Sequence, residues 1–93
     1  MINISPAAED DLSGIALDIA THRPRIAQRW LETAQETFEM LDRQPDVGEV
    51  RIGFGVPGCR SFSHGNYVIF FRRVDSGIEI ARVIHASRDL GNL

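Results

Sequence analysis

The sequence predicts an α+β fold in which an N-terminal helical hairpin packs on a small antiparallel sheet, in the order β-α-α-β-β-β. Two stretches with helical spacing of apolar residues occupy the first half of the chain. Three stretches rich in β-branched and aromatic residues occupy the second half. The chain has 93 residues, of which 43% are hydrophobic, and these values are typical of one globular domain. We therefore expect residues 1–93 to form a single domain.

The first strand and the first helix meet at Ser5. Ile2 and Ile4 alternate in a short strand, and Ser5 is then suited to cap a helix that begins with Pro6, because proline at the first helical position loses no hydrogen bond. Leu17 lies off the apolar stripe of this helix. The stripe itself consists of Ala8, Leu12, Ile15, Ala16 and Ile19.

A second helix is expected to begin at Pro24 and to end by Gln44, since the residue before Pro45 is pushed out of helical geometry. The short break between the two helices predicts an antiparallel hairpin. Leu31 lies off the apolar face of the second helix. That face consists of Ile26, Ala27, Trp30, Ala34, Phe38 and Leu41.

A loop with several glycines follows from residue 46 to residue 58. Gly53 and Gly55 disfavour a strand within it. Even so, the loop contains an alternating pattern that predicts a partial edge strand, formed by Val50, Ile52, Phe54 and Val56.

The last part of the chain reads as a β-meander. We expect strands at 59–63, 67–74 and 78–85, joined by a His64–Gly65 turn and by a turn at 75–77. The middle strand is apolar on both faces, with Val68 and Phe70 on the face opposite Tyr67. This pattern predicts that the hairpin covers one face and that a curled sheet or another chain covers the other.

Charge divides the chain into an acidic and a basic half. All ten basic residues are arginines. Residues 1–49 carry ten acidic residues and four arginines, whereas residues 50–93 carry three and six. This asymmetry predicts two surfaces with different partners, although chance segregation on a small domain would look the same. A pI near 5.5 disfavours a protein that works mainly on nucleic acid.

Several classes of site and location can be excluded or disfavoured. The sequence lacks an apolar run of membrane-spanning length and a secretory signal, and its single cysteine, Cys59, fits a reducing compartment, so we expect a cytoplasmic protein. The glycine-rich segment 53–58 has no lysine to complete a phosphate-binding loop. His22, His64 and His85 lack metal-ligand spacing. We expect neither a metal nor a cofactor.

One set of residues is a candidate binding surface. The expected strands bring arginines within reach of one another, and a guanidinium fork suits phosphate or carboxylate. A solvated sheet face that balances the acidic helices is the alternative. His85 could act as a general acid or base, or could simply cap and pack the strand end. The arginines are Arg60, Arg72, Arg73, Arg82 and Arg88.

The ordered set of motifs resembles the ParE-type toxins of the ParE/RelE superfamily over nearly the whole chain. The opening Ser5-Pro6-Ala7-Ala8 with Asp11-Leu12 and Ile15 is similar, as is the second helix with Ala27 and Phe38 closing in Leu41, Pro45 and Gly48. The end is also similar, in Gly58-Cys59-Arg60-Ser61-Phe62, Tyr67-Val68-Ile69-Phe70-Phe71-Arg72, Ile80-Ala81-Arg82-Val83-Ile84-His85 and Arg88-Asp89-Leu90.

This resemblance implies the toxin of a bacterial type II toxin–antitoxin system. It implies a non-enzymatic inhibitor of DNA gyrase that a ParD-like antitoxin of the ribbon-helix-helix type wraps and neutralises. On that basis the candidate partner-binding residues are Leu17, Leu31, Arg60, Val68, Phe70, Arg72, Arg82, His85 and Arg88. We expect Val68 and Phe70 to present an exposed apolar face to the partner.

RelE-type ribonucleases, which cut mRNA on the ribosome, belong to the same superfamily and are the alternative. They often carry arginine directly after the tyrosine of the middle strand, whereas Val68 follows Tyr67 here. They also rely on lysines and usually end in tyrosine or histidine, whereas this sequence has no lysine and ends at Leu93. The sequence therefore favours a toxin that acts by docking.

Overall fold

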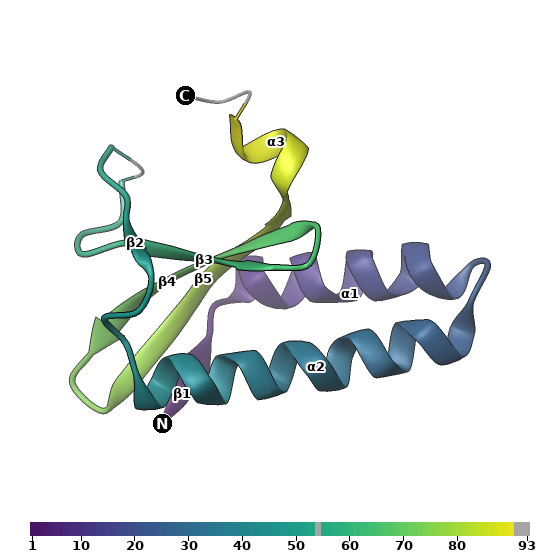
Figure 1. Cartoon of the computed structure of the whole chain (residues 1–93), viewed down its shortest axis with the longest axis horizontal. Helices are drawn as coiled ribbons and strands as arrows, with labels where there is room; N and C mark the ends of the chain where they lie inside the picture. Colours follow the sequence, from purple (N-terminus) through teal and green to yellow (C-terminus); the bar gives the residue numbers. More distant parts are fainter. Residues whose placement is uncertain (54, 91–93) are drawn as a thin grey trace.

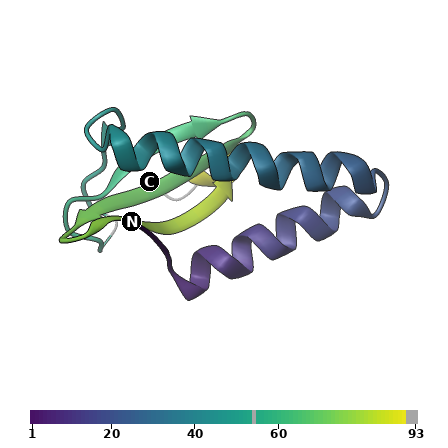
Figure 2. The same cartoon turned by 90° about the horizontal axis from the view of Figure 1, so that it is seen from below.

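The computed structural model describes residues 1–53 and 55–90, and within them the helical hairpin covers one face of a five-stranded sheet (Figure 1, Figure 2). The helices are α1 (Pro6–Ala20), α2 (Pro24–Arg43) and the short α3 (Ala86–Leu90). The strands are β1 (Ile2–Ile4), β2 (Glu49–Val50), β3 (Arg60–His64), β4 (Tyr67–Val74) and β5 (Gly77–His85). The predicted α+β class and the order β-α-α-β-β-β are confirmed, and the structure adds the two-residue strand β2 and the short α3.

The sheet has the order β1-β5-β4-β3-β2. Three of its four pairings are antiparallel, as expected, but β1 pairs with β5 in parallel, with Ile2 opposite Ile78 and Ile4 opposite Ile80. Alternation of apolar residues places a strand in a sheet but does not give its direction. The helical hairpin that follows β1 carries the chain to β2 at the opposite edge of the sheet.

The main core lies between α1, α2 and the central strands. Phe38 and Leu41 of α2 and Phe71 of β4 are its large buried side chains. Ile26 was expected to join this face but is 49% exposed. In Figure 1 and Figure 2 the hairpin extends past the end of the sheet, so the sheet does not reach the first turn of α2, in which Ala27 alone is buried.

A second, smaller core lies on the other face of the sheet. Val68 and Phe70 are only 7% and 4% exposed, and Cys59, Val56 and Ala86 pack with them. The expectation that Val68 and Phe70 form an exposed face is therefore wrong. The cover comes from the chain's own loop before β3 and from the start of α3, not from a curled sheet or another chain.

One turn and one short strand differ slightly from the predicted positions. His64 pairs with Tyr67, so the first β-hairpin loop is Gly65–Asn66, with Gly65 at φ +60°. A positive φ at the first loop residue is what a type II′ turn requires. Only Glu49 and Val50 of the loop 46–58 pair as a strand, which is less than the alternation predicted, and Phe54 of that pattern lies outside the described residues.

No helix in the described parts of the chain has the length and apolar character needed to cross a lipid bilayer.

Candidate functional site

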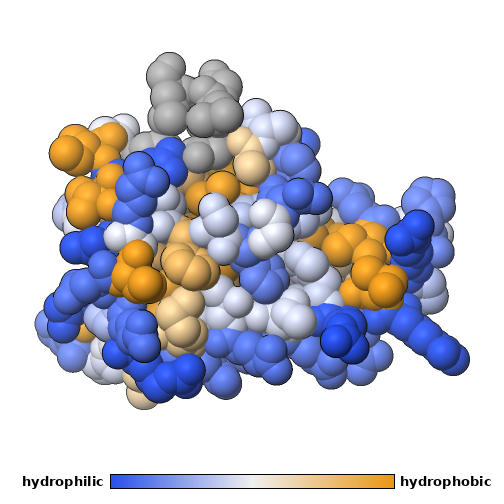
Figure 3. Space-filling model, viewed as in Figure 1, coloured by the Kyte–Doolittle hydropathy of each residue, from blue (hydrophilic) through white to orange (hydrophobic). Residues whose placement is uncertain are grey.

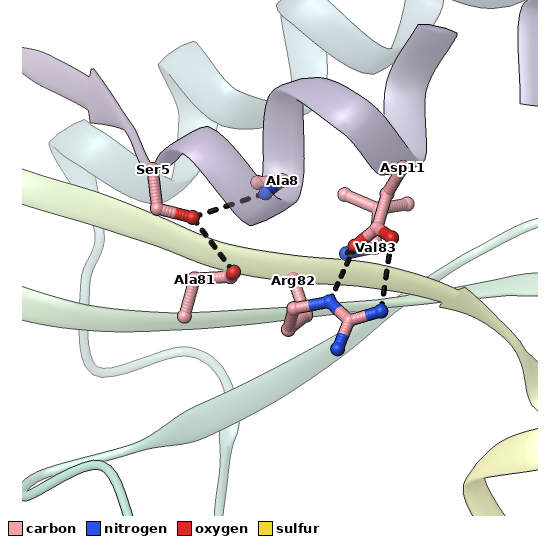
Figure 4. A network of polar contacts seen from close by, with 6 residues as sticks. All are labelled: Ser5, Ala8, Asp11, Ala81, Arg82 and Val83. Atoms are coloured by element: carbon pink, nitrogen blue, oxygen red, sulfur yellow. Dashed lines mark hydrogen bonds and ion pairs between the residues drawn. The ribbon is translucent and has the colours of Figure 1, made fainter. Parts of the chain in front are cut away.

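The start of α1 is fastened to β5 by two polar side chains (Figure 4). The Ser5 hydroxyl accepts a hydrogen bond from the Ala8 N–H at 3.0 Å and donates to the Ala81 carbonyl at 2.8 Å. It thus caps the helix, as the sequence predicts, and also holds the sheet. Ala81 lies at an irregularity in the register, where Phe70 faces Arg82 but Phe71 faces Ile80. Such bulges re-aim the side chains beside them.

The second fastening is the carboxylate of Asp11. It accepts hydrogen bonds from Arg82 Nε at 2.7 Å and Arg82 Nη2 at 3.0 Å, and a third from the Val83 N–H at 2.9 Å. The Asp11 side chain is 14% exposed and that of Arg82 is 53% exposed. The hydrogen bond to Asp11 raises the pKa of Arg82 above its already high ordinary value, so this guanidinium stays charged and paired.

We expect Asp11→Ala to lower the free energy of unfolding by about 2 kcal/mol, because the Val83 N–H loses its acceptor and Arg82 loses its partner. Chemical denaturation followed by Trp30 fluorescence measures this change. Asp18→Ala is the matched control, since Asp18 is an exposed carboxylate of the same helix. Equal losses in the two variants would contradict a special role for Asp11.

A cavity of about 450 Å³ opens between α1, the end of β5 and the start of α3. Arg82, His85 and Arg88, three of the expected partner-binding residues, line it together with Tyr67. Its wall carries two aspartates as well as two arginines, so the formal charges balance. The second aspartate is Asp18.

His85 is oriented by its neighbours in this cavity. Its Nδ1 accepts a hydrogen bond from the Ser87 N–H at 3.2 Å and lies 2.8 Å from the Ser87 hydroxyl. A neutral ring in this arrangement keeps its proton on Nε2. The ring also packs edge-on against Tyr67, with the centroids 5.3 Å apart. This geometry fits a capped strand end and also a ring nitrogen available to a ligand.

The predicted arginine cluster does not form one patch. Arg60 and Arg73 both lie near Asp46, with N–O distances of 3.9 Å and 3.7 Å. Arg72 is elsewhere and pairs with Glu79 at 2.9 Å. Successive residues of a strand point to opposite faces, so Arg72 and Arg73 of β4 lie on different sides of the sheet. The set therefore divides into Arg60 and Arg73 beside Asp46, Arg72 beside Glu79, and Arg82 and Arg88, which line one cavity.

A groove of about 500 Å³ runs between α1 and α2 near the hairpin turn. Leu17 and Leu31, which the sequence placed off the helix stripes, lie on it and are 71% and 40% exposed. Hydrophobic side chains gather over this part of the two helices in Figure 3. The remaining lining residues are mostly small or apolar, namely Leu12, Ser13, Ala16, Ala20, Ala27 and Gln28.

The thiol of Cys59 is another side chain that could carry chemistry, but it is buried. Cys59 is 2% exposed, and burial raises the pKa of its thiol although Arg51 opposes this shift. It packs with Val68 and Phe70 in the smaller core. No group of three or more histidine, cysteine or acidic side chains suited to a metal ion occurs in the parts of the chain that the structure describes.

His64, which the sequence placed in a turn and did not mark as part of a site, is the last residue of β3. Its ring lies against Thr33 and Thr37 of α2 and edge-on to Trp30. Burial lowers the pKa of His64. No sequence pattern marked the two threonines, apart from their position one helical turn apart beside the apolar face.

The lowered pKa of His64 predicts a pH dependence of stability. The unfolded ring titrates near pH 6.5 and the folded ring below it, so the unfolded chain binds more protons between these values. The contribution of His64 is therefore complete above pH 6.5 and declines as the pH falls toward the folded pKa. Unfolding free energies of the wild type and His64→Gln should diverge above this window and converge below it. Parallel curves would contradict this.

Comparison with known proteins gives a family and a fold. The family model for the ParE toxin of the type II toxin–antitoxin system parDE matches residues 2–90. A structure of the chromosomal ParDE system from P. aeruginosa has a TM-score of 0.74 at 22% identity, covering 90% of this chain and 92% of that one. The RelBE2 toxin–antitoxin complex from Mycobacterium tuberculosis has a TM-score of 0.60 at 27% identity, covering 91% and 95%. Comparison with curated proteins gives no match. The chain thus belongs to the ParE toxin family of type II toxin–antitoxin systems, within the ParE/RelE superfamily.

Proposed function

We propose that this toxin inhibits DNA gyrase by protein–protein contact, without chemistry of its own, and that a ParD-like antitoxin neutralises it in the cytoplasm. Membership of the ParE family supports the proposal, because the resemblance to ParE-type toxins implies that the chain stabilises the cleaved-DNA state of gyrase. The toxin would reach DNA only indirectly, through gyrase or through the antitoxin.

The observation that carries this proposal is the contrast between the groove and the cavity. The groove presents exposed Leu17 and Leu31, as a docking surface does. In the cavity, by contrast, Arg82 is already paired with Asp11, and the arginines and aspartates of the wall balance. A site that stabilises the charge of a cleaved phosphate needs an excess of positive groups.

The groove suits one kind of antitoxin segment. Its small side chains, such as Ala16, Ala20 and Ala27, leave room for bulky residues, and its two walls are helices. An amphipathic helix that lays its apolar face into such a groove is a common mode of recognition. We place the antitoxin there.

A gyrase assay tests the proposal. The purified toxin should abolish supercoiling by purified gyrase and should accumulate cleaved DNA, and its cognate antitoxin should restore supercoiling. His85→Ala should act like the wild type, because no step uses its imidazole. Unimpaired gyrase at saturating wild-type toxin would refute the proposal.

A RelE-like, ribosome-dependent mRNA endonuclease is the second candidate, because Tyr67, Arg82, His85 and Arg88 meet in one cavity. His85 would serve as the general acid or base and the arginines would face the phosphate. Cleavage of mRNA on programmed ribosomes that is lost in His85→Ala would establish this function instead.

A further inference from the structure

His64 joins the end of β3 to α2 through two threonine side chains. Its Nε2 lies 3.3 Å from the Thr33 hydroxyl oxygen, and its Nδ1 lies 3.0 Å from that of Thr37. Trp30 packs edge-on against the same ring, with the centroids 5.8 Å apart. Each ring nitrogen thus faces the hydroxyl of a different threonine of α2.

The hydrogens of these hydroxyls are already in use. The Thr33 hydroxyl donates to the Trp30 carbonyl at 2.9 Å, and the Thr37 hydroxyl donates to the Thr33 carbonyl at 3.1 Å. A hydroxyl has one hydrogen, so a threonine that donates to the helix carbonyl can only accept a hydrogen bond from His64. Two acceptors therefore face the two ring nitrogens.

Only a protonated ring satisfies this arrangement completely. An imidazolium has two N–H donors, one for each threonine. A neutral ring has one N–H and one lone pair. The threonine beside the lone pair then either faces it with its oxygen, without a hydrogen bond, or turns its O–H toward the ring and gives up its bond to the helix carbonyl. Either way, the neutral state has one hydrogen bond fewer.

We propose that His64 is a proton-sensitive latch, whose charging adds one hydrogen bond to the network that joins β3 to α2 and whose discharging removes it. Placing a charge in this half-buried site costs more free energy than the extra hydrogen bond contributes. The ring therefore charges only in acid, and the fold is less stable there although the network holds one more hydrogen bond. Trp30, which contacts the ring of His64, is followed on α2 by Leu31, which lines the groove.

The surroundings of His64 leave the two hydroxyls as its specific partners. On α2, the charged residues one turn from Thr33 are Arg29 and Glu36, which are exposed and opposite in sign. On β4, Tyr67 pairs with His64, and His85 of β5 lies beyond the Tyr67 ring. None of the ion pairs within residues 1–53 and 55–90 involves His64.

Histidine NMR of the intact chain tests the latch. In the wild type at acid pH, both ring N–H protons of His64 should be visible, because each is held by a hydroxyl. Thr33→Val and Thr37→Val keep the branched shape but remove an acceptor, and each should lower the titration midpoint of His64 by roughly 0.5–1 pH unit. Thr33→Ser and Thr37→Ser should restore it.

Trp30, as the single tryptophan, gives an independent readout. A charged imidazole beside the indole should quench its fluorescence, so the emission should fall with the same midpoint and should lose that step in His64→Gln. An unchanged midpoint in both valine variants would overturn the latch, as would rapid exchange of both ring protons in the acidified wild type. The wild-type spectra decide the matter even if a variant fails to fold.

Discussion

Replacing Leu17 and Leu31 together by aspartate should weaken binding of the cognate antitoxin at least 100-fold, whereas the toxin should stay folded. Both side chains are exposed on the groove, so the free toxin gives up little when they change. Burying a leucine contributes about 1.5–3 kcal/mol, and each 1.4 kcal/mol changes a dissociation constant tenfold. Two lost leucines, each replaced by a carboxylate that resists desolvation, thus account for the expected loss. Titration calorimetry with the purified antitoxin measures it.

Ile26→Asp is the matched control for this experiment. Ile26 lies on the same hairpin and is 49% exposed, but it does not line the groove. The change from an exposed apolar residue to aspartate is the same, so its affinity should stay within a few-fold of the wild type. If Ile26→Asp weakens binding while the double variant does not, the antitoxin occupies a different face of the hairpin.

Gly77→Ala should cost about 3–5 kcal/mol of unfolding free energy, a large part of the total for a domain of this size. A Cβ at this position would overlap the Met1 carbonyl oxygen and would come within 2.7 Å of Asp42 Oδ1. The backbone there also has φ +150°, which side chains rarely adopt. Pairing of β1 with β5 must therefore loosen. Urea denaturation followed by Trp30 fluorescence measures the loss.

Two other glycines separate the overlap from the backbone strain. Gly65 has φ +60° with open space around its Cβ, so Gly65→Ala should cost only about 1 kcal/mol. Gly14 lies in α1 with nothing within 4 Å, so Gly14→Ala should stabilise the chain by about 0.5–1 kcal/mol. A loss in Gly77→Ala no larger than that in Gly65→Ala would show that β1 moves aside freely.

Asp11 shows how far sequence reasoning reaches at the candidate site. Its position matches the buried stripe of α1, three residues after Ala8 and four before Ile15. A carboxylate on such a stripe indicates a partner across the interface, but the sequence does not say which. The structure supplies the partner, since the bulge in β5 turns Arg82 and the Val83 N–H toward this helix.

The arginines show the opposite case, in which a correct local prediction led to a wrong grouping. Arg60, Arg72 and Arg82 do lie on β3, β4 and β5 as expected. Their side chains nevertheless pair with three different carboxylates, those of Asp46, Glu79 and Asp11. The direction of a side chain depends on the register and on a bulge, and both arise from contacts between strands.

The sequence by itself determined the helices, their caps and the long strands, because these depend on neighbours within a few residues. The Ser5 cap, the end of α2 before Pro45 and the span of β4 are of this kind. Only the tertiary structure decided the parallel pairing of β1, the burial of Phe70 and the setting of His64 between two threonines. These features depend on packing between segments far apart in the chain, and local periodicity carries no information about such pairings.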